Sequence, residues 1–385
     1  MNYGKGLDGG TGFLVGSNQN DDSVKFSSQR NCFLTIDDDG SGIEDMLTSA
    51  GAQLVKINNK LNLLGEDAIT FSNMLSSFKS QKATLKRPMK DGVLNSQEES
   101  SAISIISVLV DGILGKPKKD KETCVFSIPS NPLNSEKNNT FHTAMFKQIL
   151  TKLGYRPIAL NEALAVIYAE NPKMGDMPMS GIAISMGAGQ VNVCMAIRGY
   201  PVIEFSIVGS GDYIDKQVSV LSGMPISTVT KIKENQLDFD KIDYNDVVIA
   251  GLDIHYTELL TNMMKDFSRK FAESGSVYDH PIEIVVTGGT ASPKGFETKF
   301  KSILEEMDLP FEVKGVRMSQ DMLNTVSKGC LIKAMQEEKK LQKKDETAPK
   351  PAPKEEKPAP KPAPKPVEKP SPKPETPKPE GDSPE

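Results

Sequence analysis

Apolar segments with the spacing of strands and of helices alternate along most of this chain. The segment CVFSIPS (124–130) is typical of a buried strand, and the next segment carries apolar residues at helical spacing, at Phe141, Met145, Ile149 and Leu153. The segment PIALNEALAVIYAE (157–170) then predicts a strand that leads into a helix. This alternation predicts an α/β fold.

The second half of the chain begins with three strand patterns in a row, which predict a β-meander. They are GIAISMG (181–187), QVNVCMAIRG (190–199) and YPVIEFSIVG (200–209). The segments that follow predict helices around 212–234 and 252–274, a strand at 281–289, a helix at 295–307, a strand at 310–316 and a helix at 324–336. The stretch at 234–253 is expected to form a small sheet.

The composition changes sharply near residue 337. The segment 337–385 holds more than half of the chain's 26 prolines and no aromatic residue, and its Lys and Glu/Asp nearly cancel. Such a segment cannot bury enough apolar area to offset its conformational entropy. We therefore expect a disordered tail with polyproline II character. It serves either as a spacer or as a docking arm for a partner protein.

Charge and cysteine usage narrow the possible partners and the compartment. The net charge of −5 argues against a nucleic-acid partner. The four cysteines are scattered without a CxxC pair, which suits a reducing compartment. The start MNYGKG lacks the apolar core of a signal peptide, and the longest apolar run, AISIISVLV, is too short to span a bilayer. A cytoplasmic protein is expected.

Three glycine turns are the candidate chemistry of this chain. Backbone N–H groups in such turns form anion-binding concavities, and glycine lets the backbone approach a phosphate closely. Asp8, in the first turn, is suited to hold hydrated Mg²⁺. Any one of these turns could be a plain hairpin, but three in this order favour a phosphate site. The turns are Asp8-Gly9-Gly10-Thr11-Gly12, Gly187-Ala188-Gly189-Gln190 and Thr287-Gly288-Gly289.

The order of these turns resembles that of the actin superfamily. The segments IPSNP, NEALAVIYAE, GSGDYIDKQV and VSKGCLIKA lie at the corresponding places between and after the turns. LKRPMKDGVLN (85–95) and GSGDYID (209–215) resemble bacterial actin-like proteins of the MreB type. The resemblance implies a two-lobed, ribonuclease H-like ATPase fold with a nucleotide cleft between lobe I (1–160) and lobe II (161–336), followed by the tail at 337–385.

The resemblance also implies ATP and Mg²⁺ as cofactors and assigns roles by position. Asp8 matches the metal-linked residue of the first turn, and Glu162 matches the residue that polarises the attacking water. A carboxylate at the start of a cleft helix can orient water, although acids favour the first turn of any helix. The implied nucleotide-binding residues are Gly9, Gly10, Thr11, Gly12, Ser185, Gly187, Ala188, Gly189, Gln190, Gly211, Asp212, Lys231, Gly288 and Gly289.

Ser185 departs from the family pattern, which has Asp at that position. A hydroxyl can donate a hydrogen bond but carries no charge, and losing a positioned carboxylate commonly costs on the order of 10²–10⁴ in rate. We therefore expect nucleotide binding with a weak ATPase activity. Gln190 also stands where relatives often have Thr.

Four functions from different classes are compatible with this sequence. The leading one is an actin-like cytoskeletal protein that polymerises with itself under the control of ATP, because repeated head-to-tail contacts build open filaments. The alternatives are a pseudo-enzyme scaffold that recruits partners through its tail, a chaperone-like ATPase and a small-molecule kinase. No autonomous membrane anchor is expected, since the first turn starts almost at the N-terminus and QEEKKLQKKDE has no apolar face. Cell shape, DNA segregation and organelle positioning are all open roles.

Overall fold

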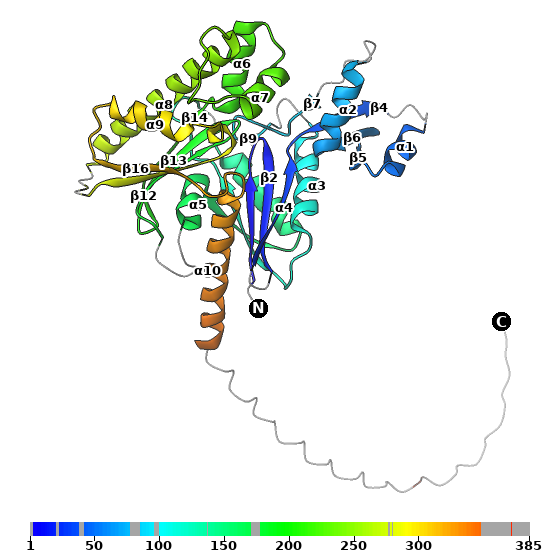
Figure 1. Ribbon diagram of the computed structural model, residues 1–385. Helices are drawn as coiled ribbons and strands as arrows, with labels where there is room; N and C mark the ends of the chain where they lie inside the picture. Colours follow the sequence, from blue (N-terminus) through cyan, green and yellow to red (C-terminus); the bar gives the residue numbers. More distant parts are fainter. Residues whose placement is uncertain are drawn as a thin grey trace, which may run out of the picture.

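The computed structural model describes residues 3–20, 23–37, 42–77, 85–95, 100–136, 138–170, 178–275, 278, 280–347 and 371. Two five-stranded sheets form the body of the molecule, and helices cover their faces (Figure 1). A smaller sheet lies beside the first large sheet. Apart from residue 371, the tail beyond residue 347 lies outside the described residues, so the expectation of a disordered tail stays a prediction.

The first large sheet has the strand order β11-β10-β1-β2-β3. Strands β1, β2 and β3 form an antiparallel meander, and β1 pairs in parallel with β10, which pairs in parallel with β11. Strand β10 is buried along most of its length, which explains its nearly continuous apolar sequence. The bounds are Lys5–Gly9 (β1), Phe13–Asn20 (β2), Ser23–Arg30 (β3), Thr123–Ile128 (β10) and Arg156–Asn161 (β11).

The second large sheet repeats this topology, with the order β14-β13-β12-β15-β16. Strands β12, β13 and β14 form the predicted meander, and β12, β15 and β16 run parallel. The bounds are Gly181–Met186 (β12), Gln190–Ile197 (β13), Tyr200–Val208 (β14), Ile282–Thr287 (β15) and Val313–Met318 (β16). Two sheets of the same topology place their first hairpin turns, at 10–12 and 187–189, in equivalent positions.

Two helices lie between the large sheets and join them. Helix α5 (Glu162–Ala169) is apolar almost throughout and contacts strands of both sheets, and α10 (Thr325–Thr347) contacts β1, β10 and α5. Their side chains form one buried cluster with Val125 of the first sheet and Ala183 of the second. The two halves therefore share a core at this point, and α10 runs down from it toward the C-terminus (Figure 1).

The other helices cover the outer faces of the sheets. On the first sheet these are α3 (Ala102–Leu114) and α4 (Thr140–Lys152), and around the second sheet they are α6 (Gly211–Ser222), α7 (Ile226–Asn235), α8 (Val247–Glu273) and α9 (Phe296–Glu305). In α4 the predicted apolar stripe is displaced. Phe141 is 47% exposed, while His142 and Phe146 are buried beside Ile149, because the helix turns a neighbouring face to β10.

A four-stranded sheet, absent from the sequence interpretation, has the order β5-β6-β4-β7 and buries Leu34, Leu47 and Leu63 in a separate small core. Its elements are β4 (Phe33–Asp37), α1 (Ile43–Ser49), β5 (Leu54–Ile57), β6 (Lys60–Leu64), α2 (Gly65–Ser77) and β7 (Leu85–Lys86). The hairpin of β8 (Met89–Lys90) and β9 (Val93–Leu94) follows, and one 3₁₀ turn, η1 (Gly289–Ala291), follows β15.

Two expectations about segment boundaries differ from the structure. The expected small sheet at 234–253 does not form: α7 extends to Asn235, and Asp238 makes a single isolated bridge to Lys294. The remaining residues from Val247 on belong to α8, which Asp246 caps by accepting hydrogen bonds from N–H groups of its first turn. Helix α10 continues ten residues beyond 337. Glu338 is buried and accepts hydrogen bonds from the backbone N–H and the hydroxyl of Thr123, so the folded body includes this residue. Within the described ranges, every helix is too short or too polar to span a bilayer.

Candidate functional site

The first glycine turn joins β1 to β2 and is held from outside by side chains of neighbouring segments. Asn31 donates from Nδ2 to the Gly10 carbonyl at 2.9 Å, and Thr11 Oγ1 accepts the N–H of Gly92 at 3.1 Å. A Cβ at Gly10 would lie 2.6 Å from the Phe13 carbonyl oxygen, so only glycine fits there. The turn is therefore held in place by hydrogen bonds from two neighbouring segments.

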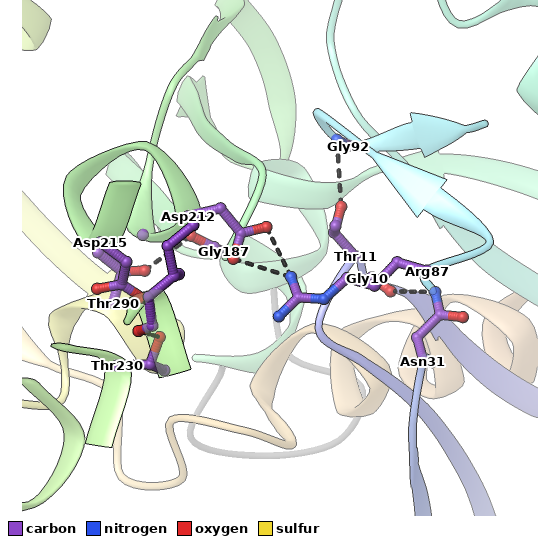
Figure 2. A network of polar contacts seen from close by, with 12 residues as sticks. Gly10, Thr11, Asn31, Arg87, Gly92, Gly187, Asp212, Asp215, Thr230 and Thr290 are labelled. Carbon is purple, nitrogen blue, oxygen red and sulfur yellow. Dashed lines mark hydrogen bonds and ion pairs between the residues drawn. The ribbon is translucent and has the colours of Figure 1, made fainter. Parts of the chain in front are cut away.

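The second turn, between β12 and β13, lies against the start of α6. The Asp212 N–H donates to the Ala188 carbonyl at 2.8 Å, and the Thr290 hydroxyl donates to the Gly187 carbonyl at 2.8 Å (Figure 2). Gln190 donates from Nε2 to the Asp91 carbonyl at 2.6 Å. The turn thus has its carbonyls engaged by lobe II and its far side covered by the β8–β9 hairpin.

The third turn follows β15 and approaches the second. Gly288 has φ +100°, and a Cβ there would lie 2.3 Å from the Met186 carbonyl oxygen, so this crossing requires glycine. Thr287 donates from its hydroxyl to the Met322 carbonyl at 3.1 Å, which ties the turn to the segment before α10. All three turns therefore meet at one place between the two large sheets.

The space where they meet is a cavity that we call the turn cleft. Eleven of the predicted site residues line it: Asp8, Gly10, Thr11, Gly12, Glu162, Ser185, Gly187, Ala188, Asp212, Gly288 and Gly289. Five predicted residues do not: Gly9, Gly189, Gln190, Gly211 and Lys231. Gly9, Gly189, Gln190 and Gly211 support the turns from behind. A Cβ at Gly189, for example, would lie 2.5 Å from the Gly92 nitrogen.

Lys231 lies on the exposed face of α7, outside the cleft. The cleft lysine is Lys233, which is 6% exposed and donates from Nζ to Asp215 at 2.8 Å and to the Gly211 carbonyl at 3.1 Å. Side chains two residues apart on an α-helix point about 200° apart around its axis, so Lys231 and Lys233 lie on opposite faces of α7. The burial of Val229 and Lys233, spaced by four residues, marks the inner face.

Two partly buried carboxylates face the cleft, Asp8 from β1 and Glu162 from the start of α5. Asp8 accepts a hydrogen bond from the Ser127 hydroxyl at 2.8 Å. Glu162 accepts one from the Ser185 hydroxyl at 2.7 Å and one from Asn192 Nδ2 at 3.1 Å. Asn161 caps α5 by accepting the N–H of Leu164, which places Glu162 at the first position of that helix. Sequence reasoning missed Ser127 and Asn192, since neither belongs to a turn.

Burial raises the pKa of both carboxyl groups. Removal from water raises the pKa of Asp8 to about 6, opposed by the Ser127 hydrogen bond. Burial and then the charge of Asp8 raise the pKa of Glu162 to about 8, although Ser185 and Asn192 donate to it. The two carboxylates therefore repel each other, and a cation between them would favour the ionised form of both.

An ion pair crosses the mouth of the turn cleft. Arg87, between β7 and β8, donates from Nη1 to Asp212 Oδ1 at 2.8 Å and to Oδ2 at 2.6 Å. Figure 2 shows the two groups of turn residues on either side, with the Arg87 side chain reaching from one to the other. The cavity behind has a volume of about 150 Å³, below the roughly 300–1,000 Å³ typical of small-molecule sites. The cleft is narrow in this conformation.

Comparisons with known proteins agree with this architecture. A family model described as Volactin matches residues 1–334. A double helical filament of MamK aligns with a TM-score of 0.61 at 16% identity, covering 86% of this chain and 98% of the MamK chain. MreB5 of Spiroplasma citri bound to AMPPNP aligns with a TM-score of 0.60 at 16% identity, covering 89% of this chain and 99% of the other. No curated protein matches. The chain shares the fold of MamK and MreB5, which is the actin-like fold that the sequence predicted.

Proposed function

Because this chain belongs to the volactin family and has the actin-like fold, we propose that it is a cytoskeletal protein that binds ATP with Mg²⁺ in the turn cleft and assembles into filaments. The carrying observation is the convergence of three glycine turns on one cleft with two partly buried carboxylates. These groups come from positions as far apart as Asp8 and Gly289, and nothing but the fold brings them together. A core stabilised by packing alone would not place two repelling carboxylates there.

The cleft residues fit a nucleotide with a metal ion. The turns offer backbone where no side chain fits, as at Gly10 and Gly288. Asp215, which lines the cleft, keeps one buried carboxylate oxygen, Oδ1, without a hydrogen-bond partner. Within the described residues no cluster of three or more His, Cys, Asp or Glu could hold a metal alone. This suits Mg²⁺, which keeps several waters and needs one or two carboxylates plus phosphate oxygens.

In this proposal the residues of the cleft have different roles. Asp8 is the metal-linked carboxylate, and Lys233 with Asp215 lines the cleft beside the start of α6. Glu162 accepts hydrogen bonds, so it can orient a water molecule toward the phosphate end. Bound Mg²⁺ supplies positive charge that stabilises the phosphate oxygens. Ser185 adds a donor to Glu162 where relatives have a carboxylate, and we infer a weak ATPase activity.

Nucleotide entry requires the cleft to open. A volume of about 150 Å³ is too small for a nucleoside triphosphate, so the halves must part and the Arg87–Asp212 pair must break. That pair is partly exposed, with about 40% of each side chain accessible, and such pairs are worth about 1 kcal/mol or less. Breaking this pair therefore costs little free energy compared with the binding free energy of a nucleoside triphosphate.

The filament proposal is supported by the fold and by what the similar proteins do. The MamK structure is a double helical filament, and MreB5 structures hold AMPPNP or ADP. The first test is sedimentation and negative-stain microscopy of the purified full chain with ATP, ADP or no nucleotide, with phosphate release followed in the same samples. Filaments that require ATP support the proposal. Saturable ATP binding without filaments would contradict the cytoskeletal part alone.

A second candidate is a scaffold protein that has the same fold but neither binds nor hydrolyses ATP. Two observations favour it, namely Ser185 in place of a carboxylate and the narrow cleft closed by Arg87. The scaffold would recruit a partner protein through its proline-rich tail. Absence of ATP binding by isothermal calorimetry, together with a folded protein, would select this candidate over the first.

We propose the cytoplasm as the compartment. The four cysteines are buried and unpaired, which suits a reducing environment. Cell shape, DNA segregation and organelle positioning remain the candidate roles of a filament, and localisation of a fluorescent fusion in growing cells separates them.

A further inference from the structure

Strand β16 is the last strand of the second large sheet and borders a groove lined by both charged and apolar side chains. The groove lies between β16 and α9 and has a volume of about 590 Å³. In Figure 1, β16 and α9 lie side by side at the left of the view. An edge strand presents backbone N–H and C=O groups that can pair with another extended chain.

The opposite edge of the same sheet shows what a covered edge looks like. The segment 131–134 lies along β14, and the Leu133 N–H donates to the Ser206 carbonyl at 2.9 Å. Asn134 completes the cover, since its side chain donates to the Val208 carbonyl and accepts the Val208 N–H. Among the described residues no segment pairs with β16 in this way. One edge of this sheet is therefore covered from within the chain, and no described residue covers the other.

Part of the groove is lined by apolar side chains. Leu304 of α9 and Val316 of β16 are buried, and Met307, Leu309 and Phe311 are half-buried and pack against the same core. A helix beside an edge strand, with apolar side chains between them, is an arrangement that accepts a peptide as an additional strand. Alternate side chains of such a peptide would point to these apolar side chains.

The charged side chains around β16 indicate what kind of peptide would bind beside it. Lys314 is exposed, lies where β16 shifts register against β15, and has no ion-pair partner among the described residues. By contrast, Arg317 is paired with Glu170 and Glu283, and Lys301 of α9 is paired with Glu297. The two acids of the groove, Glu305 and Asp308, belong to the helix side. The free cation is therefore on the strand.

We propose that β16 and α9 form a docking groove for a partner protein, which adds an extended, proline-free segment to the sheet. That segment carries an acidic side chain beside Lys314 and apolar side chains over the apolar part of the groove. The proposal does not depend on ATP binding or on filament formation.

Two other occupants fit less well. The tail at 348–385 has proline at nearly every second or third position, and proline cannot donate to a strand ladder. A second copy that paired through β16 about a twofold axis near the start of the strand would bring two Lys314 ammonium groups onto one face of the joined sheet. Lysine on an edge strand is a known means of preventing such pairing.

The test uses the full chain and the blocked hexapeptide Thr-Glu-Thr-Val-Thr-Val. Fluorescence anisotropy measures its binding, and hydrogen exchange with mass spectrometry locates it. We expect saturable binding with slower exchange confined to peptides that contain β16. The same hexapeptide with Lys in place of Glu should bind about tenfold more weakly. Lys314→Glu should reverse that preference, while Lys147→Glu, an exposed lysine on α4, should leave it unchanged.

Four outcomes would overturn the proposal. The first is no binding, and the second is binding of the Glu and Lys hexapeptides with equal affinity. The third is protection of β16 that rises with protein concentration in the absence of peptide, which would mean that a second copy covers the edge. The fourth is protection that disappears when residues 348–385 are removed, which would mean that the tail covers it.

Discussion

Arg87 and Asp212 form an ion pair across the mouth of the turn cleft, with 2.6 Å between Nη1 and Oδ2. Arg87 follows β7, next to the small sheet, and Asp212 lies in the first turn of α6. The pair thus links the two sides of the cleft at its opening, where a nucleotide would enter.

Asp212→Asn should raise the affinity for ATP by up to about fivefold. The variant has no Arg87–Asp212 ion pair to break when the cleft opens, and such a pair contributes about 1 kcal/mol or less. Titration with a fluorescent ATP analogue measures the change. Asp111→Asn is the control, since Asp111 pairs with Lys116 away from the cleft. A loss of affinity in Asp212→Asn would instead show that Asp212 contacts the nucleotide.

Ser185→Asp should increase phosphate release by at least about tenfold, since it restores a carboxylate where such groups commonly contribute on the order of 10²–10⁴ in rate. Without nucleotide the variant should melt at lower temperature than the wild type, because Glu162 loses a hydrogen-bond donor and gains a negative neighbour. Ser185→Ala separates the effects, as it removes the donor without adding charge. Equal rates in all three proteins would refute the role of this position.

Glu162→Gln should change the pH dependence of stability. The pKa of Glu162 is raised from 4.5 to about 8 in the folded protein, so the folded state holds this proton more tightly than the unfolded chain does. The wild type therefore loses stability as pH rises from 4.5 to 8, and the variant should avoid a loss on the order of 5 kcal/mol. Urea unfolding at the two ends of this range, without nucleotide, measures it. Parallel profiles would contradict the assignment.

His142→Leu should act in the opposite direction. His142 is buried against Phe146 with neither ring nitrogen hydrogen-bonded, and burial lowers its pKa from 6.5 to about 4. The unfolded chain gains this proton first as pH falls, so the wild type loses stability from pH 6.5 down to 4, by roughly 3 kcal/mol. The variant should lose less over that range in thermal unfolding scans. An unchanged acid limb would show that His142 is protonated in the folded state.

Lys233→Met should weaken nucleotide binding by about tenfold or more, because it removes the buried cation of the cleft and leaves Asp215 unpaired. Lys231→Met is a matched control on the same helix and should bind as the wild type does. Calorimetric titration with ATP compares them, and circular dichroism checks that both variants are folded. Equal losses in the two variants would mean that helix α7, and not the cleft, was disturbed.

The sequence determined the elements whose evidence is local. The meander over 181–208, the strand at 282–287 and the glycine turns follow from apolar periodicity and from backbone conformations that only glycine accepts, as at Gly288. The sheet at 33–64 was not predicted, because its short, partly polar strands carry little periodic signal.

Tertiary structure decided which side chains meet. The inner face of α7, and with it Lys233 over Lys231, depends on how that helix packs on lobe II. The end of the folded body depends on a contact of Glu338 with Thr123, 215 residues away in the chain. The pairs Arg87–Asp212 and Ser185–Glu162 likewise join segments that are separated in sequence. Local pattern sets backbone conformation, but contacts between distant side chains arise only when the two halves pack together.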